Sequence, residues 1–251
     1  MAIGNFVKSL QDIMRKDAGI NGDAQRIEQI VWLLFLKIFD TKEAEWELLE
    51  DNYKEIIPSK YRWSNWANDE EGITGDELLE FVDRLFKDLR DMEIGEGTDA
   101  RKILVREFFQ DTHNYMKSGT LLREVINVVS KIDLEDESER HAFNDIYETI
   151  LKDLQSAGNA GEFYTPRAVT DFVVDMLQPK FREKIADFAC GTGGFLVSAL
   201  EYILKNQEEE FDTDYLKVLG ESIYGIEKKP LPYSLCLTNM MLHDLDTLLL
   251  M

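Results

Sequence analysis

Apolar residues recur at helical spacing through the first 156 residues of the chain. Neighbouring apolar positions lie three or four residues apart, which is the repeat of an amphipathic helix, and there is little of the alternation typical of a strand. The predicted helices span residues 1–20, 24–40, 76–92, 98–113, 120–129 and 139–156. We therefore expect an all-helical N-terminal domain over residues 1–156.

The predicted helix over residues 24–40 is the most apolar stretch of the chain. Its apolar residues go nearly all the way round the helix, as in an element that is buried on every side. Asp23 precedes it and is a suitable N-cap residue. Arg26, Glu28 and Lys37 interrupt the apolar run, which is also too short to span a bilayer. The pattern therefore predicts the central helix of a bundle and not a membrane span.

Aromatic residues are frequent between residues 41 and 75, where Pro58 and Gly72 break any long helix. Interleaved aromatic side chains can stack on bases, but their neighbours here are mostly Asp and Glu, which repel nucleic acid. We therefore expect core aromatics that anchor loops. They are Trp46, Tyr53, Tyr61, Trp63 and Trp66.

The pattern changes after residue 156. Residues 157–161 (AGNAG) read as a flexible linker, and helices then alternate with short apolar strands over residues 162–251. Thr165 is a suitable N-cap and Pro166 a suitable first residue for a helix that ends at Leu177. The elements predicted beyond it are a strand before Asp187, a helix over 195–205, a strand over 222–227 and a helix over 231–243. This order predicts βαβ structure in a second, α/β domain.

The stretch Asp187–Phe195 (DFACGTGGF) joins the first of these strands to a helix. Its glycines allow a sharp turn and let a ligand lie against bare main chain. The N-terminal amides of the helix point into the same space, and the Asp187 carboxylate lies beside them. Such a site suits a ligand with an amino-acid end and a nucleoside end. A glycine turn without a cofactor is the alternative.

The glycine pattern also bears on the class of cofactor. The dinucleotide-binding pattern G-x-G-x-x-G fails because its sixth position is Leu196. This disfavours a nucleotide-dependent dehydrogenase. A methyltransferase that acts on protein or on a small molecule stays open on the turn alone.

The chain carries a formal net charge of −21. This charge repels a phosphate backbone, so a stand-alone nucleic-acid binder is excluded, and a DNA substrate would need positive charge from another segment or subunit. Cys190 and Cys236 are the two cysteines, and they form neither a disulfide framework nor a zinc site. We expect Cys190 to be a packing residue. With no signal peptide and no membrane-spanning run, the expected location is the reducing cytoplasm.

Three segments, in this order, resemble the adenine-N6-specific DNA methyltransferase M (modification) subunits of type I restriction–modification systems. They are Gly161–Arg167 (GEFYTPR), Asp187–Phe195, and Tyr224–Glu227 (YGIE) followed by Leu237–His243 (LTNMMLH). The helical front half, with Leu33–Lys37 (LLFLK), resembles that family's N-terminal domain. The resemblance covers most of the chain. It implies a helical domain followed by the opening part of a Rossmann-like α/β domain that binds S-adenosylmethionine (AdoMet).

The resemblance also implies a set of cofactor-binding residues. They are Glu162, Phe163, Tyr164, Thr165, Pro166, Arg167, Asp187, Gly191, Thr192, Gly193, Gly194 and Glu227. The resemblance implies that Phe163, Tyr164 and Thr165 border the methionine end of the cofactor. It also implies that Asp187 faces the ammonium group of that end, directly or through water. The glycine turn lies against the cofactor with its main chain. Glu227, at the end of the second strand, is placed to accept both ribose hydroxyls, because a carboxylate only accepts.

Other roles stay open for some of these residues. Phe163 and Tyr164 could simply pack under the linker, and Glu227 could be a surface carboxylate at a strand end. Arg167 could pair with a phosphate or with Asp171 four residues later.

The sequence departs from the family where catalysis is expected. Adenine-N6 enzymes need an Asn/Asp-Pro-Pro-aromatic loop that grips a flipped base, and no two prolines of this chain are adjacent. We therefore expect no catalytic residue, and no metal ligand, within the chain. We interpret it as the N-terminal fragment of a longer M subunit, able to bind AdoMet weakly but unable to methylate DNA alone.

The expected function is that of the intact family. A full-length protein would transfer a methyl group from AdoMet to adenine N6 in DNA and so protect host DNA. Its partners would be DNA, a specificity subunit that reads the sequence, and a restriction subunit. The exposed edge of an incomplete sheet could also pair with a second copy. The alternative is a non-catalytic helical module that binds partner proteins or clamps DNA.

Overall fold

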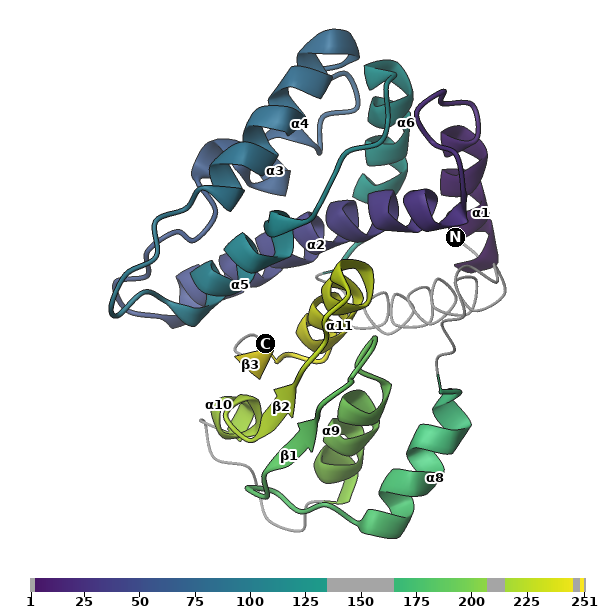
Figure 1. The fold of residues 1–251 in the computed structure, drawn as a ribbon. Helices are drawn as coiled ribbons and strands as arrows, with labels where there is room; N and C mark the ends of the chain where they lie inside the picture. Colours follow the sequence, from purple (N-terminus) through teal and green to yellow (C-terminus); the bar gives the residue numbers. More distant parts are fainter. Residues whose placement is uncertain (1–2, 135–164, 207–214, 246–248, 251) are drawn as a thin grey trace. The chain divides into compact units, whose positions relative to one another are not determined.

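The computed structural model describes residues 3–134, 165–206, 215–245 and 249–250. The chain divides into two compact units, Met1–Asn159 and Ala160–Met251. The first is helical and the second combines helices with a small sheet (Figure 1). The predicted helix over 139–156, the linker over 157–161, and Glu162, Phe163 and Tyr164 lie outside the described residues.

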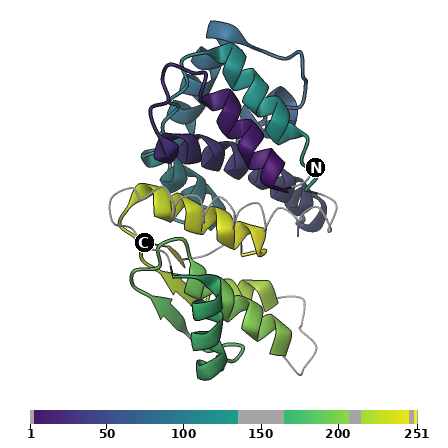
Figure 2. The ribbon, with the colours of Figure 1, turned by 90° about the vertical axis from the view of Figure 1, so that its right-hand side faces the viewer.

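The described part of the first unit contains only helices and their connections. They are α1 (Ile3–Met14), α2 (Asp23–Leu49), the short 3-10 helix η1 (Ser59–Tyr61), α3 (Trp63–Trp66), α4 (Gly75–Arg90), α5 (Ala100–Gln110) and α6 (Gly119–Ser130). α1 and α6 lie side by side (Figure 2). The prediction of a helical N-terminal domain is confirmed over these residues.

Helix α2 is buried on nearly every side, as its apolar pattern predicts. Trp32, Phe35 and Leu36 are each at most 1% exposed, although they point in different directions around the helix. The ring of Phe35 stacks on that of Phe108 from α5, with centroids 3.7 Å apart. Burial of rings of this size is the main source of stability in such a core, so α2 is the element on which the other helices pack.

Two details of α2 differ from the prediction. The helix continues to Leu49 instead of ending near Asp40, because residues 41–49 contain neither Gly nor Pro and Trp46 packs edge-on against Phe39. Asp23 is the first helical residue and not the N-cap, which is Gly22. The Asp23 carboxylate pairs instead with Arg26, where it still favours the positive end of the helix dipole.

The aromatic residues between 41 and 75 belong mostly to the core. Trp46, Tyr61, Trp63 and Trp66 are each at most 7% exposed. The indole of Trp66 donates to the Tyr61 carbonyl at 3.1 Å, which fixes the connection that contains η1 and α3. The prediction of core aromatics is confirmed for these four residues, although Trp46 lies on α2 and not beside a loop, and Tyr53 is only partly buried.

The second unit is built around a parallel sheet. Its elements are α8 (Arg167–Leu177), β1 (Ile185–Asp187), α9 (Gly194–Asn206), α10 (Tyr215–Gly220), β2 (Ile223–Gly225), α11 (Pro230–Leu242) and β3 (Leu249–Leu250). The strand order is β1-β2-β3, and both pairs are parallel. In the register of the first pair, Asp187 lies opposite Gly225. Parallel pairing brings the carboxyl ends of successive strands to one edge of the sheet.

The core of the second unit lies between α9, β2 and α11. Its fully buried members include Leu196, Leu200, Ile223 and Met240. Helix α8 packs beside α9 (Figure 1), but it leaves Phe172 and Met176 62% and 67% exposed. The second unit therefore has a packed core and, on α8, an uncovered apolar face.

Three features of this unit were not predicted correctly from the sequence. The strand Leu249–Leu250 and the helix α10 were not predicted, because neither is long enough to show a repeat. The start of α8 was placed one residue too early. Pro166 occupies the N-cap position with a ψ of 141°, which keeps it and Thr165 outside the helix.

Among the described residues, no helix combines the length and apolarity that crossing a membrane requires.

Candidate functional site

The glycine turn follows β1 directly and leads into α9. The Gly193 amide donates to the Cys190 carbonyl at 2.8 Å, which closes a β-turn over residues 190–193. Gly191 and Gly193 have φ values of +56° and +81°, in the left-handed region that side chains other than glycine rarely adopt. The backbone conformation at both positions therefore favours glycine. The turn also places the N-terminal amides of α9 at the end of the sheet.

Two carboxylates flank the turn. Glu227 follows β2, and its Oε2 accepts from the Gly191 amide at 3.0 Å while Oε1 accepts from the Lys229 amide at 2.8 Å. The Oδ1 of Asp187, at the end of β1, accepts from the Ala189 amide at 3.0 Å. Each carboxylate oxygen has two acceptor sites, so both groups retain capacity for a ligand. The structure thus brings Asp187, Gly191 and Glu227 together from two strand ends.

A cavity of about 160 Å³ lies at this place. Its lining includes Thr165, Asp187, Gly191, Thr192 and Gly194 from the predicted set. Other lining residues are Thr170, Ala189, Cys190 and Phe195, which were not singled out as site residues from the sequence. Glu227 adjoins the cavity through its hydrogen bond to Gly191. Gly193 and Pro166 do not line the cavity, and Gly193 shapes the turn instead.

Arg167 links α8 to the start of α9. Its Nη1 donates to the Gly194 carbonyl at 3.0 Å. Next to this contact, the Ser198 hydroxyl donates to Asp171 at 2.7 Å and lies 2.8 Å from the Thr170 hydroxyl. Thr170 is completely buried, so these polar contacts fix α8 against α9. The described contact of Arg167 is thus with main chain, a role that neither alternative for it had included.

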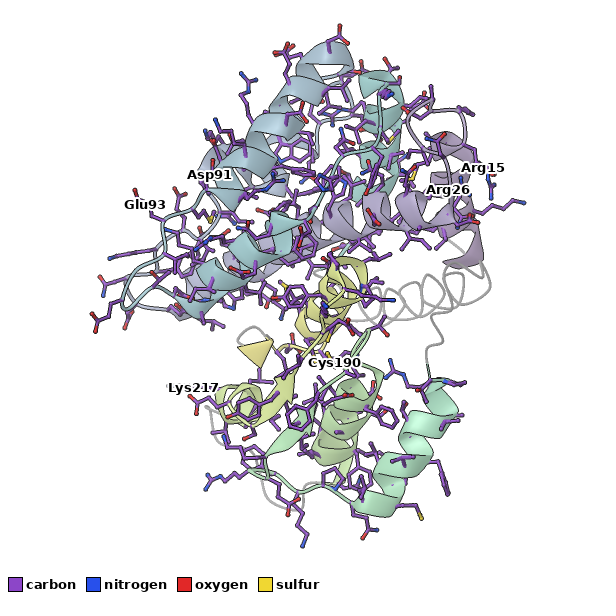
Figure 3. All side chains as sticks on the ribbon, in the orientation of Figure 1. Arg15, Arg26, Asp91, Glu93, Cys190 and Lys217 are labelled. Carbon is purple, nitrogen blue, oxygen red and sulfur yellow. The ribbon has the colours of Figure 1, made fainter. Side chains whose placement is uncertain are left out.

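Helix α11 supports the turn from the other side. The Asn239 side-chain amide donates to the Thr192 carbonyl at 3.1 Å. The Cys236 sulfur lies 3.9 Å from that of Cys190, which Figure 3 labels at the end of β1. Both cysteines are buried free thiols, in line with the packing role predicted for Cys190. The hydrogen bond with Cys190, together with burial, raises the pKa of the Cys236 thiol well above its usual value.

Asn239 was not recognised from the sequence as part of this site. The available signal was a single amide side chain within an otherwise apolar helix, because a buried polar group of this kind requires a hydrogen-bond partner. Its partner lies 47 residues earlier in the chain. Residue spacing alone could not identify that partner.

The site is suited to bind a polar ligand. It offers main-chain amides at a helix N-terminus, which match an acceptor or anionic group, and two carboxylates at strand ends, which match positive and hydroxyl groups. The described residues hold no group of His, Cys, Asp and Glu side chains arranged for a metal ion. What the geometry supports is recognition of a polar small molecule at the carboxyl edge of a parallel sheet.

Comparison with protein families matches both halves of the chain. Residues 3–129 match the family described as HsdM N-terminal domain. Residues 138–250 match the family described as N-6 DNA Methylase. The first match runs from the start of α1 to the penultimate residue of α6, and the second includes the glycine turn and both flanking carboxylates.

Individual relatives agree with these families. The chain is 56% identical over 247 residues to the Type I restriction enzyme EcoEI methylase subunit of Escherichia coli, a match that covers 98% of this chain and 50% of the relative. It is 38% identical, with a TM-score of 0.84, to the crystal structure of a modification subunit assigned to a type I restriction enzyme from Vibrio vulnificus YJ016. That match covers 99% of this chain and 55% of the other.

A second solved structure is similar to the same degree. It belongs to a structural study of complex assembly and conformational transition in the type I R-M system. This chain matches it at 36% identity with a TM-score of 0.82. The match covers 99% of this chain and 50% of that chain. The chain thus spans about half the length of the relatives that it matches.

Proposed function

This chain belongs to the family of type I restriction–modification methylase subunits, and we propose that its glycine turn binds AdoMet for methyl transfer to adenine N6 in DNA. The proposal rests on one observation. Asp187 and the glycine turn line the same cavity, and Glu227 is hydrogen-bonded to the turn beside it. When bound, AdoMet would supply the methyl group. The residues of this chain would hold and orient it.

The donor set fits this cofactor. Glu227 uses one acceptor site on each oxygen for a main-chain amide, so one site on each is left for a ribose hydroxyl. Asp187 would face the ammonium group of the methionine end. The cavity of about 160 Å³ is smaller than the roughly 300–1,000 Å³ typical of small-molecule sites, so the nucleoside end would extend beyond the lining toward Glu227.

The remaining members of the site belong to the same proposal. The main chain of Thr192, Gly193 and Gly194 would lie along the cofactor, and Thr165 would border its methionine end. Arg167 would act indirectly, because its contact with the Gly194 carbonyl holds the start of α9. Glu162, Phe163, Tyr164 and Pro166 are proposed to complete the methionine side.

We also propose the domain organisation that goes with this function. A helical domain over residues 1–156 is joined by a linker over 157–161 to a Rossmann-like, AdoMet-binding domain that begins at residue 162. The parallel order β1-β2-β3 and the site at the strand ends support this assignment.

We propose that partner subunits supply the positive charge that DNA binding requires and that this chain lacks. Its net charge of −21 opposes DNA binding, so a specificity subunit would read the DNA and a restriction subunit would join for cleavage. We place the complex in the reducing cytoplasm, which the two free thiols support.

Calorimetric titration of the 251-residue chain with AdoMet tests the proposed site. Glu227→Ala is expected to weaken binding about 10- to 100-fold, because hydrogen bonds to a charged group are lost. Glu227→Gln, which retains one acceptor oxygen, should have an intermediate effect. Glu221→Ala is the matched control, since that exposed carboxylate lies at the opposite end of β2. Failure of the parent chain to bind AdoMet would contradict the proposal.

Self-association through the free edge of β1 is also proposed. Among the residues that the structure describes, β1 is paired along one edge, with β2. A largely apolar groove of about 550 Å³ lies beside the strand, between α8 and α9. Phe188 and Leu177 border it and are 76% and 74% exposed. An open strand edge beside apolar side chains favours pairing with a second copy.

Light scattering coupled to gel filtration tests this association. The parent chain is expected to show a concentration-dependent dimer, and Phe188→Lys is expected to weaken it about tenfold or more, because a charge at an edge opposes pairing. Ile103→Lys is the control, since Ile103 is an exposed apolar residue on α5 of the other unit. A parent chain that stays monomeric at every concentration, or equal losses in both variants, would exclude pairing through β1.

The helical unit as a pure interaction module is a second candidate. The end of α2 exposes two adjacent apolar side chains, Leu48 and Leu49, at 88% and 82%. We propose that this apolar pair forms part of a surface that binds another protein. The two functions are separated by the AdoMet titration, because a module of this kind would bind no cofactor.

A further inference from the structure

The carbonyl of Thr192 points into the protein, toward α11, and away from solvent. Its hydrogen-bond donor is the side-chain amide of Asn239, at 3.1 Å. Asn239 is 3% exposed and Thr192 is 6% exposed. A buried carbonyl without a donor costs free energy, so this single side chain decides whether the observed orientation of the carbonyl is favourable.

The same peptide unit carries the Gly193 amide. In a trans peptide the carbonyl and the N–H point in opposite directions. When Asn239 holds the Thr192 carbonyl, it also directs the Gly193 N–H toward the Cys190 carbonyl, which it meets at 2.8 Å. The hydrogen bond that closes the turn therefore depends on a side chain 47 residues away in sequence.

The turn has enough freedom to need this restraint. Gly193 has no side chain and adopts a φ of +81°, and glycine populates several other backbone regions at similar free energy. Rotation of the Thr192–Gly193 peptide would break the bond to Cys190. It would also redirect Thr192, which lines the cavity together with Gly191 and Gly194.

We infer that Asn239 is a positioning residue for cofactor binding: it holds the Thr192–Gly193 peptide so that the turn presents its main chain to the cavity. The inference rests on the proposed AdoMet site. Asn239 itself lies behind the turn and does not line the cavity, so its effect reaches the cofactor only through the backbone.

The test compares two neighbouring residues of α11 in the 251-residue chain. Asn239→Leu removes the donor with little change in volume. Thr238→Val is the matched control, because Thr238 is equally buried but donates to Ser234 of its own helix at 2.8 Å. Asn239→Leu is expected to weaken AdoMet binding about tenfold, and Thr238→Val by less than about twofold. Asn239→Ala serves as a second variant that favours the helix, should the leucine variant fail to fold.

A second measurement reports on the turn without any ligand. In protein labelled with ¹⁵N-glycine, the amide signals of Gly191 and Gly193 should shift in Asn239→Leu and stay in place in Thr238→Val. Equal effects of the two substitutions, or unchanged glycine signals and affinity in a folded Asn239 variant, would overturn the inference. If the parent chain binds no AdoMet while the glycine signals still move, the proposed function fails and the role of Asn239 in the turn stands.

Discussion

Gly193→Ala is expected to abolish measurable AdoMet binding and to lower the free energy of unfolding of the second unit by about 3 kcal/mol. Two costs combine at this position. A side chain at a φ of +81° strains the backbone. The added Cβ would also lie 2.8 Å from the Cys236 sulfur and 3.1 Å from the Cε of Met240. Either the turn or α11 must move, and both define the site.

Two other glycine substitutions separate these costs. Gly97 has a similar φ of +79° with open space around its Cβ, so Gly97→Ala reports the backbone strain alone, about 1 kcal/mol. The Cβ of Gly194→Ala would meet only the Cγ2 of Thr170, at an ordinary 3.6 Å. Because Gly194 lines the cavity, this variant should fold normally yet bind AdoMet more weakly. Thermal denaturation and calorimetric titration measure the two effects. Wild-type affinity in Gly193→Ala would contradict the proposed site.

Arg123→Ala is expected to destabilise the helical unit by about 3 kcal/mol. Arg123, on α6, is 5% exposed, and its guanidinium donates to main-chain carbonyls of the segment between α3 and α4. The acceptors are the carbonyls of Trp66, Ala67, Asp69 and Ile73, at 2.8 to 3.3 Å. Burial lowers the pKa of this guanidinium. Its removal takes the donor from the Trp66 and Ile73 carbonyls, whereas the Ala67 and Asp69 carbonyls still accept from Ser130 and from the Gly72 amide.

The neighbouring turn of α6 provides the control for Arg123. Asn127 contacts the same segment, but its bond to the Glu70 carbonyl is exposed to solvent, so Asn127→Ala should cost less than about 1 kcal/mol. Arg123→Lys retains the charge but not the planar fork of donors, and its stability should fall between the two. Urea unfolding followed by tryptophan fluorescence measures all three, because all four tryptophans of the chain lie in the helical unit. Equal stability of Arg123→Ala and Asn127→Ala would show that the guanidinium bonds are dispensable.

The features that the sequence predicted correctly are those encoded locally. Apolar spacing identified the helical unit and the buried character of α2, and glycines after a short apolar run identified the turn. Asp187 and Glu227 were assigned to one site by the family resemblance, and the structure brings the two strand ends together through the bond between Glu227 and Gly191. The errors were also local in origin, and they include the ends of α1 and α2, the start of α8, and the short elements η1, α3, α10 and β3.

By itself, the sequence determined the order of elements, the place of the glycine turn and the family, because each is encoded within a few consecutive residues. Only the tertiary structure decided which side chains complete the turn. Asn239 meets Thr192 across 47 residues, and Cys236 meets Cys190 across 46. The physical reason is that the hydrogen-bond partner of a buried carbonyl or thiol is determined by which residues pack against it. The packing of α11 against the turn depends on two segments that are distant in sequence, so neither segment alone predicts it.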